Sequence, residues 1–114
     1  MDMDAISKEY IDIDDALKRI GGNTDLYKRL VLRFVDGDYL DPLCAALEKG
    51  DTEESARLAH TLKGVSANLS LVKIKSVSTD LEQVIKNGTD YTACLAELKQ
   101  AYSTTLEQIA TIMK

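Results

Sequence analysis

The sequence has no tryptophan and only one phenylalanine, one proline and one histidine among its 114 residues. No apolar run approaches the roughly 20 residues that a membrane-spanning helix needs. The first residues are acidic and lack the basic and apolar stretches of a secretory signal. These absences argue against a membrane protein and a secreted one, so we expect a soluble cytoplasmic protein or a domain excised from one.

Positive charge and metal ligands are also scarce. Lysine and arginine number 14 against 19 aspartate and glutamate, and the formal charge of −5 disfavours binding to a nucleic-acid backbone. Cys44 and Cys94 show no CxxC spacing, and one histidine leaves too few ligands for a tetrahedral metal site. We predict no nucleic-acid partner, no metal site, and two buried thiols rather than a disulfide.

Apolar residues recur at steps of three and four in every long segment, and no segment alternates with the period of two typical of strands. The predicted helices cover residues 12–20, 23–36, 40–49, 52–69, 71–87 and 91–113. Asn23 and Asp51 are predicted N-caps, Asp51 in a capping box with Glu54. Short connections favour a single all-α domain, an antiparallel four-helix bundle with one or two short accessory N-terminal helices. Because the bundle uses its apolar stripes internally, we expect a monomer.

The helix predicted over residues 52–69 has an unusual solvent face. At about 100° per residue, its core stripe is Leu58, Leu62, Val65 and Leu69. The opposite face carries Ala56, His60, Lys63, Gly64 and Ala67. Exposed helix faces normally carry long charged side chains, and a glycine in mid-helix costs about 1 kcal/mol relative to alanine. Small residues around the only histidine therefore indicate close approach by another molecule.

The chemistry suited to this face is nucleophilic. An imidazole is mostly neutral at pH 7, so a ring nitrogen of His60 can attack phosphorus without a dedicated base. Lys63, one turn further on, can offset the charge of a transferred phosphoryl group. Glu82, at the edge of the apolar stripe of the next helix, is a candidate to hold the second ring nitrogen. Taken singly, each of these residues would be an ordinary solvated surface residue, and it is their combination around one histidine that favours a site.

The run from Ala56 to Leu69, ARLAHTLKGVSANL, resembles the signature of histidine phosphotransfer (Hpt) domains of bacterial multistep phosphorelays. The likeness extends in order well beyond this run, from Leu17–Gly22 to Leu81-Glu82. It implies a four-helix bundle in which His60 is the phosphoacceptor and Lys63 supports the phosphohistidine. It also implies that Gly64 gives room for a partner and that Glu82 holds the imidazole. Val65 and Ser70 depart from the family pattern, which often has a small residue and a glycine there.

The resemblance also implies partners. His60 would accept a phosphoryl group from an aspartyl phosphate on one response-regulator receiver domain and pass it to another, in a pathway fed by a hybrid sensor kinase. The domain would be no kinase and would have no intrinsic cofactor, because Mg²⁺ would sit in the receiver. Ala56, Gly64 and Ala67 would line the docking surface. Two alternatives stay open: a receiver-binding interaction domain that is not phosphorylated, and a hydrolase using His60 with Glu82.

Overall fold

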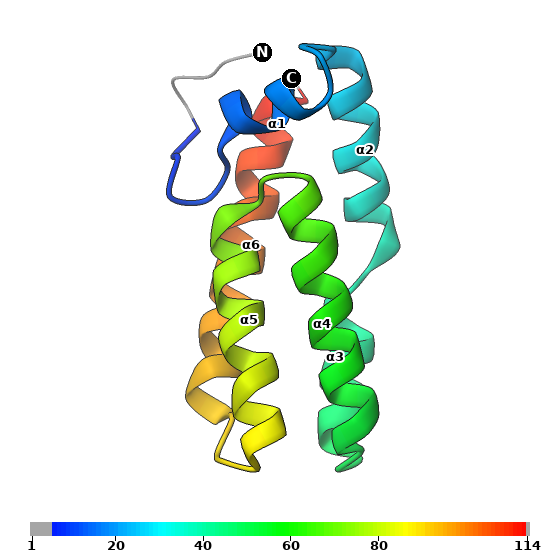
Figure 1. The fold of residues 1–114 in the computed structure, drawn as a ribbon, viewed down its shortest axis with the longest axis vertical. Coiled ribbons are helices and arrows are strands. Elements are labelled where there is room, and N and C mark those ends of the chain that lie inside the picture. Colours follow the sequence, from blue (N-terminus) through cyan, green and yellow to red (C-terminus); the bar gives the residue numbers. More distant parts are fainter. Residues whose placement is uncertain (1–5, 114) are drawn as a thin grey trace.

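The computed structural model describes residues 6–113, and the described part is helical with no strand (Figure 1). Its helices are α1 (Ile13–Arg19), α2 (Thr24–Gly37), α3 (Leu40–Glu48), α4 (Thr52–Asn68), α5 (Val72–Asn87) and α6 (Thr92–Ile112). Every helix begins and ends within one residue of its predicted range. The all-α prediction is confirmed. Within the described residues, none of the helices combines the length and the apolar composition that spanning a bilayer requires.

The helices form a narrow four-helix bundle measuring 41 × 21 × 20 Å. α2 and α3 follow one another along one edge, and α4, α5 and α6 then run alternately up and down the long axis (Figure 1). One of the four positions in the bundle is thus shared by two consecutive helices. α1 lies across the end where α4 turns into α5, so it caps the bundle as the sequence predicts.

Side-chain caps begin the helices where the sequence predicts them. Asn23 accepts a hydrogen bond from the backbone N–H of Leu26 at 3.0 Å, and Asp51 accepts one from Glu54 at 3.0 Å. Each such cap stabilises its helix by about 1 kcal/mol. The capping box is only half formed, because the Glu54 side chain pairs with Arg57 instead of returning to Asp51.

The turn between α4 and α5 passes through Ser70, whose φ of 55° is left-handed. This conformation costs a non-glycine residue about 1–2 kcal/mol. The cost is offset because Ser70 Oγ donates to Asp15 Oδ2 at 2.7 Å and the Ser70 carbonyl accepts from Asp12 N–H at 3.0 Å. Tyr27 Oη donates to the neighbouring Leu69 carbonyl at 2.9 Å. We call Asp12, Asp15, Tyr27 and Ser70 the Ser70 cluster; it lets serine stand where the resemblance implies glycine.

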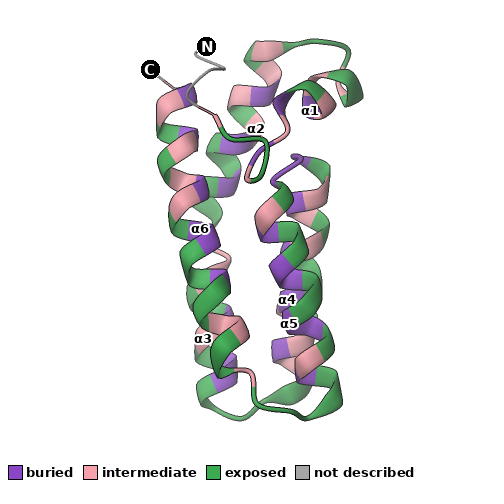
Figure 2. Ribbon diagram, turned by 90° about the vertical axis from the view of Figure 1, so that its left-hand side faces the viewer, coloured by how far each residue is buried: buried purple, intermediate pink, exposed green. Residues whose placement is uncertain are grey.

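The core lies along the inner faces of the helices, where buried residues line up in Figure 2. On α4 the buried stripe differs from the predicted one. Its members are Ser55, Ala59, Leu62, Ser66 and Leu69. Leu58 and Val65 are only half-buried, because the buried face of α4 is turned further toward α5 than the prediction has it. Ser55 and Ser66 are buried without penalty, since their hydroxyls donate to carbonyls of the preceding turn.

The two cysteines are free thiols, but the prediction that they are buried is wrong. Cys44 on α3 and Cys94 on α6 are both half-buried at the margins of the core. Partial burial still raises the pKa of both thiols, because desolvation disfavours the thiolate. The margin is where a small, weakly polar side chain is tolerated without filling a core position.

Candidate functional site

Three of the predicted site residues, His60, Lys63 and Glu82, come together on one side of the bundle, on the neighbouring helices α4 and α5. His60 lies on α4 with its side chain 65% exposed. Its Nδ1 atom is 3.2 Å from both carboxylate oxygens of Glu82 on α5. An ionised carboxylate only accepts hydrogen bonds, so this contact favours the tautomer in which Nδ1 carries the proton. Nε2 is then the ring nitrogen with a free electron pair.

Glu82 is the most constrained residue of the site. Its side chain is 8% exposed, yet it contacts three potential cations: Lys86 Nζ at 2.8 Å, Lys63 Nζ at 3.2 Å and the imidazole of His60. The contact with Lys86, followed by those with Lys63 and His60, lowers the pKa of the Glu82 carboxyl to about 2, although burial acts in the opposite direction. The carboxylate is therefore ionised at neutral pH. We call His60, Lys63, Glu82 and Lys86 the His60 cluster.

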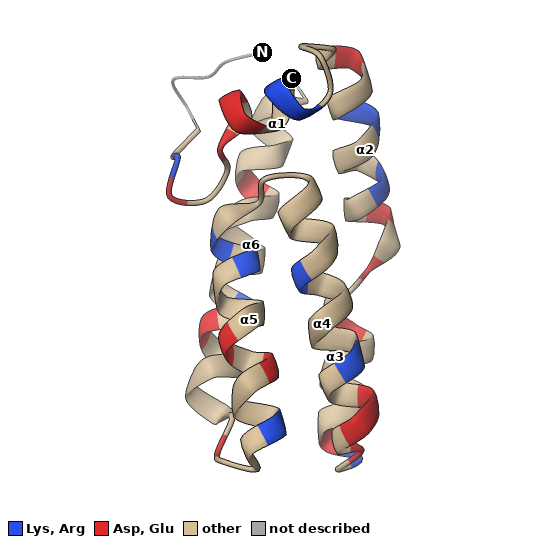
Figure 3. Cartoon of the chain, in the orientation of Figure 1, with Lys and Arg blue, Asp and Glu red and all other residues tan. Residues whose placement is uncertain are grey.

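Both helices contribute to the cluster through ordinary helical spacing. On α4, Lys63 follows His60 by three residues, and on α5, Lys86 follows Glu82 by four, so each pair lies one turn apart on one face. The chain runs in opposite directions in the two helices. The two lysines therefore reach Glu82 from opposite sides along the bundle axis. Figure 3 shows basic and acidic segments along both α4 and α5.

The small residues predicted to surround His60 do leave open surface there. Gly64 is exposed, and a Cβ built on it would meet no atom within 4 Å, so internal packing does not require glycine. Ala56 and Ala67 are half-buried, at the border of the exposed face rather than in its middle. At Gly64, four residues after His60, there is therefore no side chain to cover the outer edge of the imidazole.

A comparison with family models matches residues 37–111 of this chain with the Hpt domain. The chain belongs to the Hpt domain family. Hpt domains are phosphotransfer modules of two-component signalling that interact with receiver domains. The matched range contains α3 to α6 and with them the whole His60 cluster. The chain has no significant match among curated proteins or solved structures.

In this Hpt domain an open hollow lies beside the imidazole. Its lining residues are Glu53, Ala56, Arg57, His60, Glu82 and Lys86. Lys86 is the residue of the His60 cluster that we did not predict from the sequence, although its position four residues after Glu82 is the standard spacing for a helical ion pair. Arg57 also lines the hollow, and its guanidinium is paired with Glu54 on the same helix. The hollow gives an incoming group a place beside the exposed edge of the ring.

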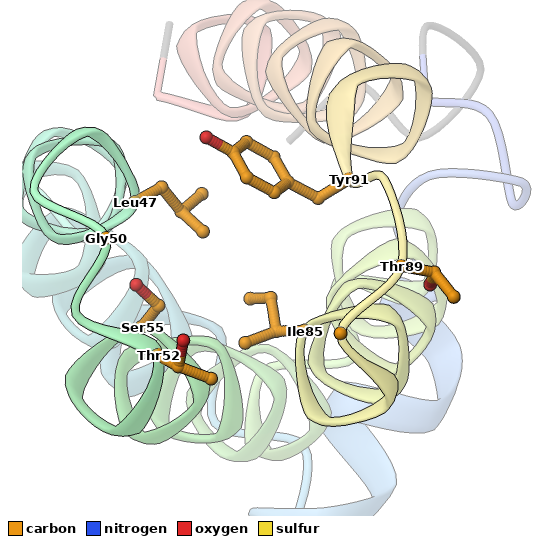
Figure 4. Close-up of a pocket in the computed structure, with 8 residues that line it drawn as sticks. Leu47, Gly50, Thr52, Ser55, Ile85, Thr89 and Tyr91 are labelled. Atoms are coloured by element: carbon orange, nitrogen blue, oxygen red, sulfur yellow. The ribbon is translucent and has the colours of Figure 1, made fainter.

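A second cavity of the Hpt domain, at the opposite end from the Ser70 cluster, has a different character (Figure 4). It lies between the α3–α4 and α5–α6 turns and holds about 180 Å³. Leu47, Ile85 and Tyr91 point into it, and the hydroxyl-bearing residues Thr52 and Ser55 also line it. The lining includes no charged side chain and no histidine, unlike that of the hollow beside His60.

Proposed function

We propose that this Hpt domain carries a phosphoryl group on Nε2 of His60 between receiver domains of a multistep phosphorelay. The observation that carries the proposal is the pairing of a largely exposed imidazole with a buried, ionised carboxylate at its other nitrogen. A nucleophile needs a free electron pair at an accessible atom and support for the charge that develops on it. His60 meets the first requirement and Glu82 meets the second.

The transfer step balances without an external acid or base. The Nε2 electron pair attacks the phosphorus of an aspartyl phosphate, and the bond from phosphorus to the aspartyl oxygen breaks. Its electron pair leaves with the receiver's carboxylate. The Nδ1 proton stays on the ring, so the positive charge of the new imidazolium faces Glu82 at 3.2 Å. In the reverse step a carboxylate oxygen of a second receiver attacks phosphorus, and the bond to Nε2 returns its electrons to the ring.

The partners in this proposal are response-regulator receiver domains and a hybrid sensor kinase, which places the module in the cytoplasm. Receivers dock over the face formed by Ala56, His60, Gly64 and Ala67, with Lys63 at its edge. Mg²⁺ belongs to the acidic pocket of the receiver, and the Hpt domain itself supplies no cofactor and no ATP-dependent kinase activity. A monomer is sufficient, because the whole His60 cluster lies within one chain.

The proposal is tested by charging several receiver domains with a small phosphodonor and mixing each with the protein and with His60→Gln. The expected result is phosphate on the wild-type protein that is labile in acid and stable in alkali, with none on the variant. A binding assay runs alongside, because His60→Gln is expected to leave docking largely intact. Docking without phosphate on the wild-type protein from any receiver would overturn the proposal in favour of an interaction domain that is not phosphorylated.

A further inference from the structure

Lys86, although its side chain is largely exposed, makes the shortest ion pair of the His60 cluster. Its Nζ lies 2.8 Å from Glu82 Oε2, and that same oxygen is 3.2 Å from His60 Nδ1. The lysine ammonium is thus two hydrogen-bond lengths from the imidazole. Lys86 and His60 also line the same open hollow. Two independent features, a shared carboxylate and a shared hollow, bring this ammonium to the ring.

Glu82 is shared between more cations than it can neutralise while His60 is unmodified. One carboxylate faces the ammonium groups of both Lys63 and Lys86, and the imidazole beside them is uncharged in the tautomer described above. The neighbouring charges do not remove this excess: Arg57 is already paired with Glu54, and Glu53 is exposed to screening solvent. The buried Glu82 carboxylate is therefore contacted by one more ammonium group than it can neutralise, beside an exposed nucleophile.

Phosphorylation changes which charges match. A phosphoryl group on Nε2 brings a charge of roughly −1.5 to −2 at pH 7. The ring, which keeps its Nδ1 proton, becomes a cation and takes up the negative charge of Glu82. Both lysines are then free to face the phosphoryl oxygens. The lysine side chain suits such an exchange, because it is a compact charge on a flexible stem and that of Lys86 is 58% exposed.

We propose that Lys86 is a second phosphoryl-binding residue, which exchanges Glu82 for a phosphoryl oxygen when His60 is phosphorylated. Lys63 binds the phosphoryl group from the side of the α4–α5 turn, and Lys86 binds it from the opposite side, through the hollow. This inference rests on the proposed phosphorylation of His60 and adds a residue to it.

The test compares wild type, Lys86→Met, Lys86→Arg and the control Lys75→Met, each phosphorylated with phosphoramidate. Lys75 is an exposed lysine on the same helix, three turns from Lys86. The first readout is the ³¹P titration of the phosphohistidine, because a bound cation favours the dianion. Loss of Lys86 is expected to raise the titration midpoint by about 0.3 to 0.5 pH unit, as expected for a partly exposed ion pair. Lys75→Met is expected to leave the midpoint unchanged.

The second readout is the equilibrium distribution of phosphate between the Hpt domain and a phosphorylated receiver. Lys86→Met is expected to shift phosphate toward the receiver by roughly 3- to 10-fold, since one charge-assisted contact to the phosphoryl group is lost. Lys86→Arg retains the charge and is expected to restore at least half of both effects. Arginine behaving like methionine, or methionine behaving like wild type, would overturn the inference while leaving the phosphorylation of His60 intact. A wild-type protein that acquires no phosphate on His60 would overturn the inference together with the proposed function.

Discussion

Two polar clusters join distant parts of this chain. They differ in whether every polar group has a partner within the protein. In the Ser70 cluster, the side chains of Asp15 and Tyr27 and the backbone N–H of Asp12 satisfy the polar groups of one turn, with each bond ending on a partner inside the fold. In the His60 cluster, one buried carboxylate is shared among three donors, and the outer side of the imidazole is open to solvent. The Ser70 cluster therefore needs no further partner, whereas the His60 cluster leaves an exposed ring nitrogen that can bind an incoming group.

From this difference between the clusters we predict that removing the Glu82 carboxylate lowers the rate of phosphoryl transfer far more than the stability of the fold. Glu82→Ala takes away the acceptor that orients His60 and balances the imidazolium, and loss of such a supporting partner typically costs 10- to 100-fold in activity. We expect the rate of phosphate transfer from a charged receiver to fall by about that factor, measured by rapid-quench kinetics. Glu82→Gln, which still accepts a hydrogen bond, is expected to retain more of the rate. An unchanged rate in Glu82→Ala would contradict the role of the carboxylate.

Gly64 offers a sharper separation of docking from chemistry. Gly64→Gln adds a long side chain one turn from His60, where the fold leaves open space. We expect transfer from a receiver to fall by roughly 10-fold, about the cost of a modest steric clash at a docking surface. Phosphorylation by phosphoramidate, which needs no docking, should be unaffected.

The control for this prediction is Gly64→Ala. It should raise the free energy of unfolding by about 0.5 to 1 kcal/mol through helix propensity. Equal slowing of Gly64→Gln with both phosphate donors would show that the position does not act through docking.

In the Ser70 cluster, substitutions should lower the stability of the fold and leave phosphoryl transfer nearly unchanged. Ser70→Ala removes the hydrogen bond to Asp15 and keeps the left-handed strain, so we expect the free energy of unfolding to fall by about 1 kcal/mol. Ser70→Gly loses the same bond but relieves the strain, and should be less destabilised. Denaturant unfolding measures both. Transfer to His60 should stay within twofold of wild type in each variant, and a large loss of transfer would show that the two clusters are coupled.

Acid provides the smallest of these effects. The folded-state pKa of Glu82 is lowered to about 2, so the carboxylate stabilises the fold above its unfolded pKa and this stabilisation is lost as the pH falls toward 2. We expect a loss on the order of 1 kcal/mol between about pH 4.5 and pH 2, because the strongest partner, Lys86, is 58% exposed and its ion pair is screened. Glu82→Gln should lose less stability over that window. The Ser70 hydroxyl lowers the pKa of the Asp15 carboxyl, so the loss of stability in acid can be compared between the two clusters.

Local patterns were enough to predict the helices and to place His60 and Lys63 on one face of α4, because caps and apolar repeats act within a few residues of the chain. Glu82, 22 residues after His60, was a candidate from its position on the next helix and from the family resemblance. The rotation of α4 was not predictable in this way. Ser55 and Ser66 count as polar in a periodicity argument, yet they are buried because each hydroxyl bonds to its own helix. Ser70 was equally hidden, because its left-handed turn depends on Asp12 and Asp15, far away in the sequence.

The most direct test of the account uses the fact that the chain has a single histidine. A long-range ¹H–¹⁵N spectrum of ¹⁵N-labelled protein reports the state of both ring nitrogens of His60 without ambiguity, before and after phosphorylation. We predict a proton on Nδ1 in the unmodified protein and phosphate on Nε2 in the product, with Nδ1 still protonated. Phosphate on Nδ1, or a proton on Nε2 before transfer, would contradict it.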